Sequence, residues 1–182
     1  MANDLNLIPN NYKESKKLFE NEKERLQKIL HNFEIIIEHI GSTSIKGSIG
    51  KGIIDIIVAC DNKEDQEKIK YLLSKNGYRQ GELNKKPDGR LFFCNVEGQT
   101  KAGDIHLHLV IKDSDNYHEV INFRNYLHNH PDEVEWYNDK KKHVANITNN
   151  SRKEYVVQKG EFVRELINRA KKNEPFKVGS GL

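Results

Sequence analysis

The amino-acid sequence predicts an α/β (α+β) protein in which helices flank a mixed β-sheet and a helical segment follows the sheet. Three observations predict this class. Two β-branched apolar runs, at 34–40 and 53–60, are typical of neighbouring strands. Residues 104–111 alternate strictly between polar and apolar side chains, as expected of a strand with one buried face. After Asp115 the apolar residues recur at helical spacing instead.

The individual elements follow from local patterns. The first helix is expected at 10–31, where Leu18 and Leu26 share one face with charged residues between them. A second helix begins near Asn62, whose side chain can cap it, and ends at Asn76-Gly77. We further expect strands at 33–40, 52–60, 78–83, 90–96 and 104–111, turns at 84–89 and 97–103, and helices at 116–129, 132–147 and 152–172.

The length of the chain fits one domain. With 182 residues it can bury about 70% of its unfolded surface without a metal or disulfide staple. We expect this domain at 1–173, its helical part at about 115–172, and a loose tail at 174–182. Cys60 and Cys94 lie in strand-like runs without metal or redox spacing, which indicates buried free thiols in a reducing compartment.

Hydropathy and charge indicate the surroundings and partners of the protein. The amino terminus has no signal-peptide pattern and no apolar run approaches 18 residues, so we expect a cytoplasmic protein that does not enter a membrane. Thirty basic and 27 acidic residues are spread through mixed-charge helices, which gives no strong nucleic-acid signal. We interpret the run Lys140–His143 as a solvated helix face rather than a phosphate track.

The segment between the first two strands has the composition of a site. Residues 41–52 are rich in glycine and serine and too long for a simple hairpin turn. Asp55 follows within the apolar strand. Its carboxylate would cost several kcal/mol if it were buried, ionised and unpaired, so it needs a partner, most simply a metal ion or another cation.

This region resembles the GrpB family (the UPF0157 group). The matching blocks are Glu38-His39-Ile40-Gly41-Ser42-Thr43-Ser44 and Lys51-Gly52-Ile53-Ile54-Asp55-Ile56. The resemblance extends to the strand at 104–109 and the helix at 123–127, so it covers most of the chain. Gly52 is a departure, because the family usually has proline there. The family is placed in the nucleotidyltransferase superfamily, and the resemblance implies that fold.

The resemblance also implies roles for particular residues. In the superfamily a Gly-Ser pair holds the phosphate tail of a nucleotide, and Gly41-Ser42 is the matching pair. Thr43 and Ser44 add amides and hydroxyls that suit a phosphate, although serine-rich turns and helix caps use the same residues. Asp55 matches a metal-binding carboxylate, but Ile57 stands where the superfamily has a second one, and a single carboxylate makes a weak site for a hard cation.

Other residues are candidates to complete the site. Glu38 ends the neighbouring strand, and His106 and His108 share a strand face with Asp104. Together with Asp55, Glu38 and the two histidines would suit Mn²⁺ or Zn²⁺ better than Mg²⁺. The alternative is that the histidines are polar surface.

Three basic residues could bind phosphate. Lys51 and Lys46 could meet it as point charges, although a solvated role is the alternative for each. Arg124 could clamp an anion or pair with a neighbouring glutamate.

These observations lead to a functional hypothesis with alternatives. We expect a nucleoside triphosphate as substrate, Mg²⁺ or Mn²⁺ as cofactor with Zn²⁺ as the alternative, and transfer of a nucleoside monophosphate to an unknown hydroxyl acceptor. A non-catalytic nucleotide- or metabolite-binding module and a metal-dependent hydrolase or phosphodiesterase using His106 and His108 are the alternatives. The sequence lacks the motifs of P-loop, dinucleotide-binding, serine-hydrolase and zincin enzymes.

Overall fold

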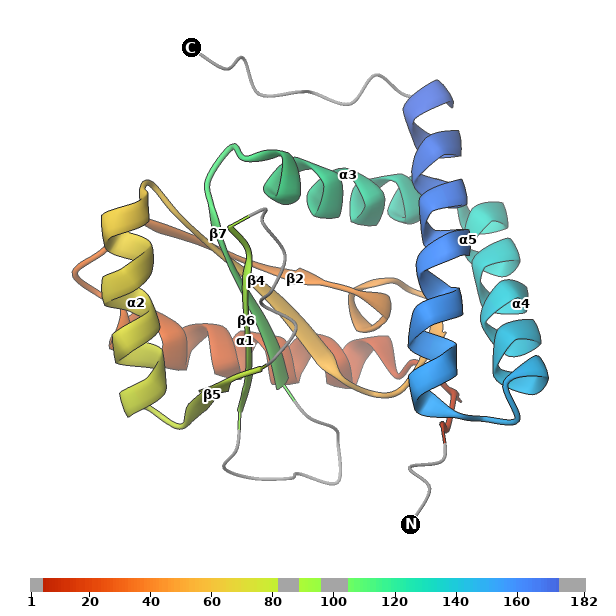
Figure 1. Ribbon diagram of the computed structural model, residues 1–182, viewed down its shortest axis with the longest axis horizontal. Helices are drawn as coiled ribbons and strands as arrows, with labels where there is room; N and C mark the ends of the chain where they lie inside the picture. Colours follow the sequence, from red (N-terminus) through yellow and green to blue (C-terminus); the bar gives the residue numbers. More distant parts are fainter. Residues whose placement is uncertain (1–4, 82–88, 96–104, 174–182) are drawn as a thin grey trace.

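A five-stranded mixed sheet forms the centre of the protein in the computed structural model, which describes residues 5–81, 89–95 and 105–173 (Figure 1). The sheet has the order β2-β4-β7-β6-β5. Its strands are β2 (Ile35–Ile40), β4 (Ile54–Cys60), β5 (Tyr78–Gln80), β6 (Leu91–Asn95) and β7 (Ile105–Ile111). β4 and β7 are parallel, whereas all other neighbours in this sheet are antiparallel. The predicted mixed sheet is therefore confirmed.

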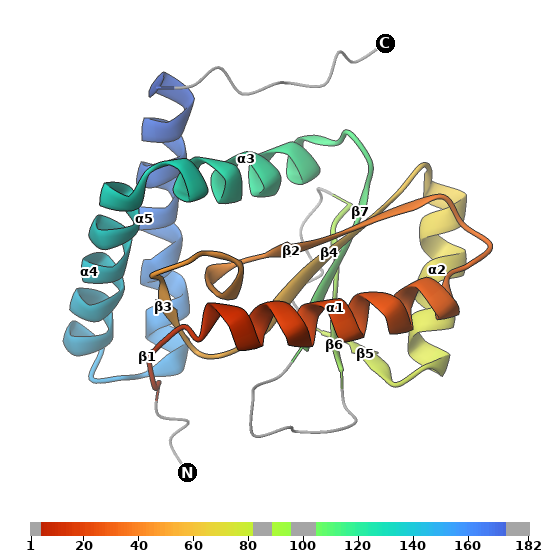
Figure 2. The same cartoon turned by 180° about the vertical axis from the view of Figure 1, so that it is seen from behind.

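Helices cover both faces of the sheet and continue beyond it. They are α1 (Tyr12–Ile29), α2 (Lys63–Lys75), α3 (Asp115–Asn129), α4 (Pro131–Ile147) and α5 (Arg152–Asn173). Figure 2 shows α1 crossing the sheet on one side, while α3 lies on the other and α4 and α5 stand together at one end of the molecule. The class predicted from the sequence, helices around a mixed sheet followed by a helical segment, is confirmed.

The face of the sheet toward α1 and α2 is an apolar core. Ile56 and Val58 of β4 and Leu107 of β7 have no exposed surface there, and Leu26 of α1 and Ile69 of α2 pack against them. Strand alternation produces this face, because every second residue of β4 and β7 is a large aliphatic side chain.

The opposite face is divided along its length. Ile40, Ile57, Ala59 and Val110 form a second apolar cluster, which Tyr117 of α3 covers. Beyond this cluster, toward the beginning of β4 and β7, the same face carries polar side chains. The apolar end is buried under α3, and the polar end is where the candidate site lies.

The helical segment has a core of its own. Tyr126 of α3, Tyr137 of α4 and Phe162 of α5 are buried in one cluster, and Ile45 from the loop after β2 joins them. This shared core holds the loop against the helices. Because of this packing, α4 borders the glycine- and serine-rich loop.

One pairing was not predicted. β1 (Ile8–Pro9) and β3 (Ile49–Gly50) form a separate two-stranded antiparallel sheet. Two residues per strand are too few to show alternation, so no pattern indicated this pairing. The expected turns at 84–89 and 97–103 lie almost entirely outside the described residues, as do Asp104 and the tail at 174–182.

Cysteine burial partly differs from expectation. Both cysteines are free, and Cys60 is buried, but Cys94 is only half-buried. Burial raises the pKa of the Cys60 thiol to about 11, so it is protonated at neutral pH. Within the described residues, none of the helices is long and apolar enough to span a membrane.

Candidate functional site

Gly41 brings the loop after β2 directly against Asp55. Its backbone has φ +70°, a conformation that side chains with a Cβ rarely adopt. A Cβ atom added at Gly41 would lie 2.3 Å from Oδ2 of Asp55. Only glycine fits here, and the loop and the carboxylate therefore form one site.

Asp55 meets two histidines from the neighbouring strand. The parallel register pairs Asp55 with His106. Its Oδ1 lies 3.5 Å from Nδ1 of His106 and 4.0 Å from Nε2 of His108. Burial by itself would raise the pKa of Asp55, but hydrogen bonding and charge from the two imidazoles outweigh it and hold that pKa well below its usual range. The expected partner of Asp55 is thus supplied in part by the protein itself.

The three side chains are accessible from one side of the sheet. Asp55 is 27% exposed, His106 17% and His108 20%. Phe92 of β6 lies beside both imidazoles, with ring centroids 5.0 Å from His106 and 5.3 Å from His108. Nδ1 of His108 is buried without a hydrogen-bond partner among the described residues. Such an unpaired buried atom is uncommon in a folded protein.

The hydroxyl groups of the short 3₁₀ helix η1 (Ser42–Ser44) differ in what they bind. The Thr43 hydroxyl donates to the carbonyl of Ile53 at 2.9 Å and lies 3.0 Å from Nε2 of His39, which must therefore be the donor. Ser44 donates to the carbonyl of Gly41 at 2.8 Å. The hydroxyls of Thr43 and Ser44 thus bind backbone carbonyls and shape the turn. The hydroxyl of Ser42 instead accepts a hydrogen bond from Lys141 of α4.

His39 is held in its neutral form. Its ring stacks on Phe19 of α1 with centroids 4.8 Å apart. Burial lowers the pKa of His39 to about 4 against the opposing charge of Asp55, and Arg124 and His128 add to the lowering. A neutral imidazole protonated at Nε2 is the tautomer that the bond to Thr43 requires.

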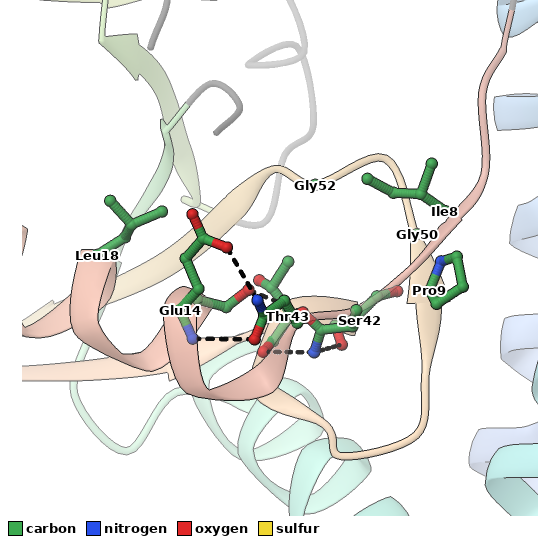
Figure 3. Close-up of a pocket in the computed structure, with 11 residues that line it drawn as sticks. Ile8, Pro9, Glu14, Leu18, Ser42, Thr43, Gly50 and Gly52 are labelled. Atoms are coloured by element: carbon green, nitrogen blue, oxygen red, sulfur yellow. Dashed lines mark hydrogen bonds between the residues drawn. The ribbon is translucent and has the colours of Figure 1, made fainter. Parts of the chain in front are cut away.

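Asn10, just before α1, fastens the turn from one side. Its Nδ2 donates to the carbonyls of Thr43 at 2.9 Å and Ile45 at 3.2 Å, and its Oδ1 accepts from Ser15 at 2.7 Å. A cavity of about 160 Å³ lies at this junction of α1, β1 and the loop (Figure 3). Glu14 and Ser42 both line it.

Side chains of α3 and α4 fasten the loop from the other side. His128 lies with Nε2 2.8 Å from the carbonyl of Ser44. Asn138 donates to the carbonyl of Gly47 at 2.8 Å and accepts from the amide of Ile49 at 2.9 Å. The loop backbone is therefore fixed by residues that lie far apart in the sequence.

Lys141 corrects the interpretation of the lysine run as a solvated face. Only 1% of Lys141 is exposed, and its Nζ bonds the hydroxyl of Ser48 at 2.8 Å, the hydroxyl of Ser42 at 3.4 Å and the carbonyl of Ile49. Nζ also lies 4.0 Å from the ring centroid of Tyr137. By contrast, Lys142 is exposed and pairs with Asp139 at the surface.

A second lysine, Lys159 of α5, interacts by its charge with Lys141 and Asp55. Burial lowers the pKa of Lys141 to about 6, and the charge of Lys159 adds to the lowering. Tyr137, which hydrogen-bonds Lys159, raises the pKa of Lys159, and the charge of Asp55 does so as well. Two lysines from the helical segment thus border the site, and Lys159 is the one held in its charged form.

The sequence interpretation missed these helical residues. A signal was present for Lys141, because Val134, Tyr137, Lys141 and Val144 recur at the spacing of one helix face. Lys141 therefore stands on the buried stripe of α4. Asn138 and Lys159 also stand at this spacing, on the apolar faces of α4 and α5, whereas Asn10 had no comparable signal.

Glu38 and Arg124 form an ion pair with each other. Nη1 of Arg124 lies 2.5 Å from Oε2 of Glu38 and 3.0 Å from the carbonyl of His39. Tyr117 donates to Oε1 of Glu38 at 3.4 Å. Glu38 shares the sheet face of Asp55, but both its oxygens are engaged toward α3. Of the two roles expected for Arg124, the structure shows pairing with a glutamate.

The remaining predicted residues lie in the loop and around it. Lys51 is half-buried and Lys46 is exposed.

A second cavity, of about 230 Å³, lies between α1, β2 and α3 and is lined by His39, Arg124 and His128. In the described part of the chain, no group of three or more His, Cys, Asp or Glu side chains is arranged to hold a metal ion. The structure brings together Asp55, His106 and His108 but directs Glu38 elsewhere.

The mixed sheet and the helices around it form a nucleotidyltransferase-like fold. A crystal structure of the Cid1 poly(U) polymerase with magnesium and 3′-dATP superimposes with a TM-score of 0.52 at 13% identity, over 76% of this chain and 43% of that one. At this identity the likeness concerns the fold alone.

Within this class the chain belongs to the GrpB family. The family model described as GrpB protein matches residues 8–169. The glutamate-rich protein GrpB of Alkalihalophilus pseudofirmus is 34% identical over 156 residues, which are 84% of this chain and 88% of that protein. A crystal structure of the conserved protein GrpB from Enterococcus faecalis has a TM-score of 0.76 at 27% identity and covers 92% of this chain and 98% of its own.

Proposed function

We propose that this protein transfers a nucleoside monophosphate from a nucleoside triphosphate to a hydroxyl acceptor. The observation that carries the proposal is the contact between Gly41 and Asp55 on a nucleotidyltransferase-like fold. The contact places the backbone of the Gly41-Ser42 turn beside an ionised carboxylate, which is the pairing of phosphate site and metal ligand that such transfer uses. Thr43 and Ser44 support this turn.

The described residues fit a divalent metal that the substrate helps to hold. Mg²⁺ is usually bound by one or two carboxylates together with phosphate oxygens and water, rather than by a cage of protein ligands. Asp55, ionised at neutral pH, would hold Mg²⁺ or Mn²⁺ with the phosphates of the nucleotide. The metal would supply charge neutralisation at those phosphates. A Zn²⁺ site needs more protein ligands than the described residues gather, so zinc is less well supported.

The reaction is an in-line displacement. The acceptor oxygen forms a bond to the α-phosphorus, the bond from that phosphorus to the oxygen bridging to the β-phosphate breaks, and pyrophosphate leaves. The hydroxyl proton goes to a base, for which His106 and His108 are the candidates because imidazole is the usual base near neutral pH. Positioning of charge by Ser42 and Asp55 supplies most of the catalysis.

A second candidate is a nucleotide-binding module without catalysis. The observation favouring it is Ile57, which stands on the Asp55 face two residues further along β4 and is completely buried under α3. A carboxylate at this position would lie in the apolar cluster. At the position where the superfamily has a second metal-binding carboxylate, this chain therefore has an isoleucine that packs in the apolar cluster.

Labelled nucleotides distinguish the candidates. The full chain is titrated calorimetrically with ATP, GTP, CTP and UTP in the presence of Mg²⁺ or Mn²⁺, and the best ligand is then incubated with hydroxyl acceptors while labelled at its α- or γ-phosphate. Nucleotidyl transfer puts the α-label into product and releases pyrophosphate. Metal-independent binding without turnover indicates the module, release of inorganic phosphate indicates a hydrolase, and absence of binding by all four nucleotides contradicts both nucleotide proposals.

A further inference from the structure

The ammonium of Lys141 is buried among neutral groups. Its three acceptors are two serine hydroxyls and a backbone carbonyl, which match the three N–H donors of a charged lysine. The ring of Tyr137 covers it from a further side at 4.0 Å. The hydrogen bonds are therefore complete, but these contacts bring no negative charge.

Such burial is expensive and needs an explanation. Burial of a lysine without an ionic partner has a cost, which appears either as the free energy of a buried charge or as loss of the proton. Lys159 increases this cost, because its own charge acts on Lys141. A methionine of similar length would fill the space without the cost. The arrangement suits an anion that arrives at the loop and supplies the missing charge.

The bonded partners show where that anion would lie. Lys141 holds Ser42, the turn serine whose hydroxyl is not used to shape the turn, and it holds Ser48 and Ile49 at the other end of the same loop. Because Lys141 donates to Ser42, the Ser42 hydroxyl keeps its own proton for a ligand. Asn138, one turn earlier on α4, fixes the intervening backbone at Gly47.

We propose that Lys141 is the positioning residue and counter-charge of an oligophosphate site at Gly41-Ser42, and that α4 is thus a part of this site. The inference rests on the proposed function for the location of the phosphates. It adds that the phosphate chain, rather than the nucleoside, is what the helical segment recognises, with Lys159 as the second cation.

Proton uptake should accompany phosphate binding. The groups that face Lys141 are the ring of Tyr137 on α4, Lys159 on α5 and the hydroxyls of the loop. With its pKa lowered to about 6, Lys141 is largely neutral at pH 7.5 in the free protein. An anion near Ser42 favours the charged form and raises this pKa. The complex therefore binds a proton that the free protein does not.

Inorganic tripolyphosphate is the probe that tests the site. It is titrated into the full chain, into Lys141→Met and into the control Lys142→Met, which removes the same charge one residue along on the exposed face. We expect tripolyphosphate binding to weaken at least about tenfold in Lys141→Met and by less than about twofold in the control. Equal binding by the wild type and Lys141→Met overturns the inference.

Thermal unfolding and proton counting separate this role from a structural one. Replacing a buried charge by an apolar side chain is often neutral or stabilising, so Lys141→Met should unfold at or above the wild-type temperature while losing tripolyphosphate. Calorimetry of the wild type at pH 7.5 in two buffers of different ionisation enthalpy should show net proton uptake by the protein once the protons that tripolyphosphate itself exchanges are accounted for, so the inference stays testable if the variant fails to fold. Absence of uptake overturns it.

The same probe separates this inference from the proposed function. Tripolyphosphate has no nucleoside to transfer. Binding that depends on Lys141 in a protein without nucleotidyl transfer would refute only the function. A wild-type protein that binds nucleotides but not tripolyphosphate would refute only the inference.

Discussion

The two halves of the candidate site are built in different ways. Asp55, His106 and His108 stand on adjacent parallel strands, where the register alone brings them together. The Gly41-Ser42 turn has no such frame and takes its shape from side chains that reach it from α1, α3 and α4. The comparison teaches that the carboxylate half is set by the pairing of two strands, whereas the phosphate half depends on the packing of helices around a loop.

The largest expected effect comes from the point where the halves touch. Gly41→Ala must place a Cβ against Asp55 in a backbone conformation that alanine disfavours, and we expect it to lower the free energy of unfolding by about 3 kcal/mol. Gly47→Ala is the matched control. Gly47 also has a positive φ but has open space around it, so only the backbone cost of about 1 kcal/mol should remain. Urea unfolding of both variants measures the difference, and equal losses would contradict the contact.

The next effect concerns the carboxylate half. Asp55→Asn keeps the shape but removes the charge, and we expect metal-dependent nucleotide binding or turnover to fall about 100-fold. Calorimetry with the best nucleotide and Mg²⁺ measures it. The control is Glu38→Gln, because Glu38 is engaged by Arg124 and should leave metal-dependent binding unchanged. A larger loss in Glu38→Gln than in Asp55→Asn would instead restore Glu38 as a metal ligand.

The fastening of the phosphate half should cost less to disturb. Asn138→Ala removes the two hydrogen bonds that hold the carbonyl of Gly47 and the amide of Ile49, which should cost about 2 kcal/mol. Asn146→Ala, at an exposed position on the same helix, is the control and should change stability by less than about 0.5 kcal/mol. If the loop were shaped by its own sequence, Asn138→Ala would behave like the control in chemical unfolding.

The smallest effect is a pH dependence at the junction. With the pKa of His39 lowered to about 4 from its ordinary 6.5, the unfolded chain binds more protons than the folded one between these values. The stability contribution is complete above pH 6.5 and is lost as the pH falls toward 4. His39→Gln should reduce the loss of stability between pH 7 and pH 5 by on the order of 1 kcal/mol in urea titrations. The exposed His31 gives a control variant, His31→Gln, which should retain the wild-type pH response.

The same comparison explains what could be predicted from the sequence. Alternation at 104–111 put His106 and His108 on one face, and Asp55 stood out as a carboxylate in an apolar strand; the pairing of β4 with β7 brings the three together. Glu38 followed the same logic, but its contact with Arg124 depends on where α3 packs. Side-chain direction on a strand is a local property, whereas engagement by a distant helix is not.

The phosphate half was only partly predictable. Gly41-Ser42 was identified through a family resemblance, and the contact with Asp55 gives it a physical basis. Lys141 looked like one member of a charged run because three neighbouring basic residues masked its place on the apolar stripe. Helix periodicity counted residue by residue, lysines included, would have placed it inside.

The grip of Asn10 and Lys141 on one turn has a consequence for synthesis. Residues near both ends of the chain hold the segment between β2 and β4, so a nascent chain emerging from the ribosome has no finished turn until α4 has appeared. The strands can pair earlier. A polypeptide released before residue 131 would thus carry Asp55 without the side chains of α4 that hold the turn beside it.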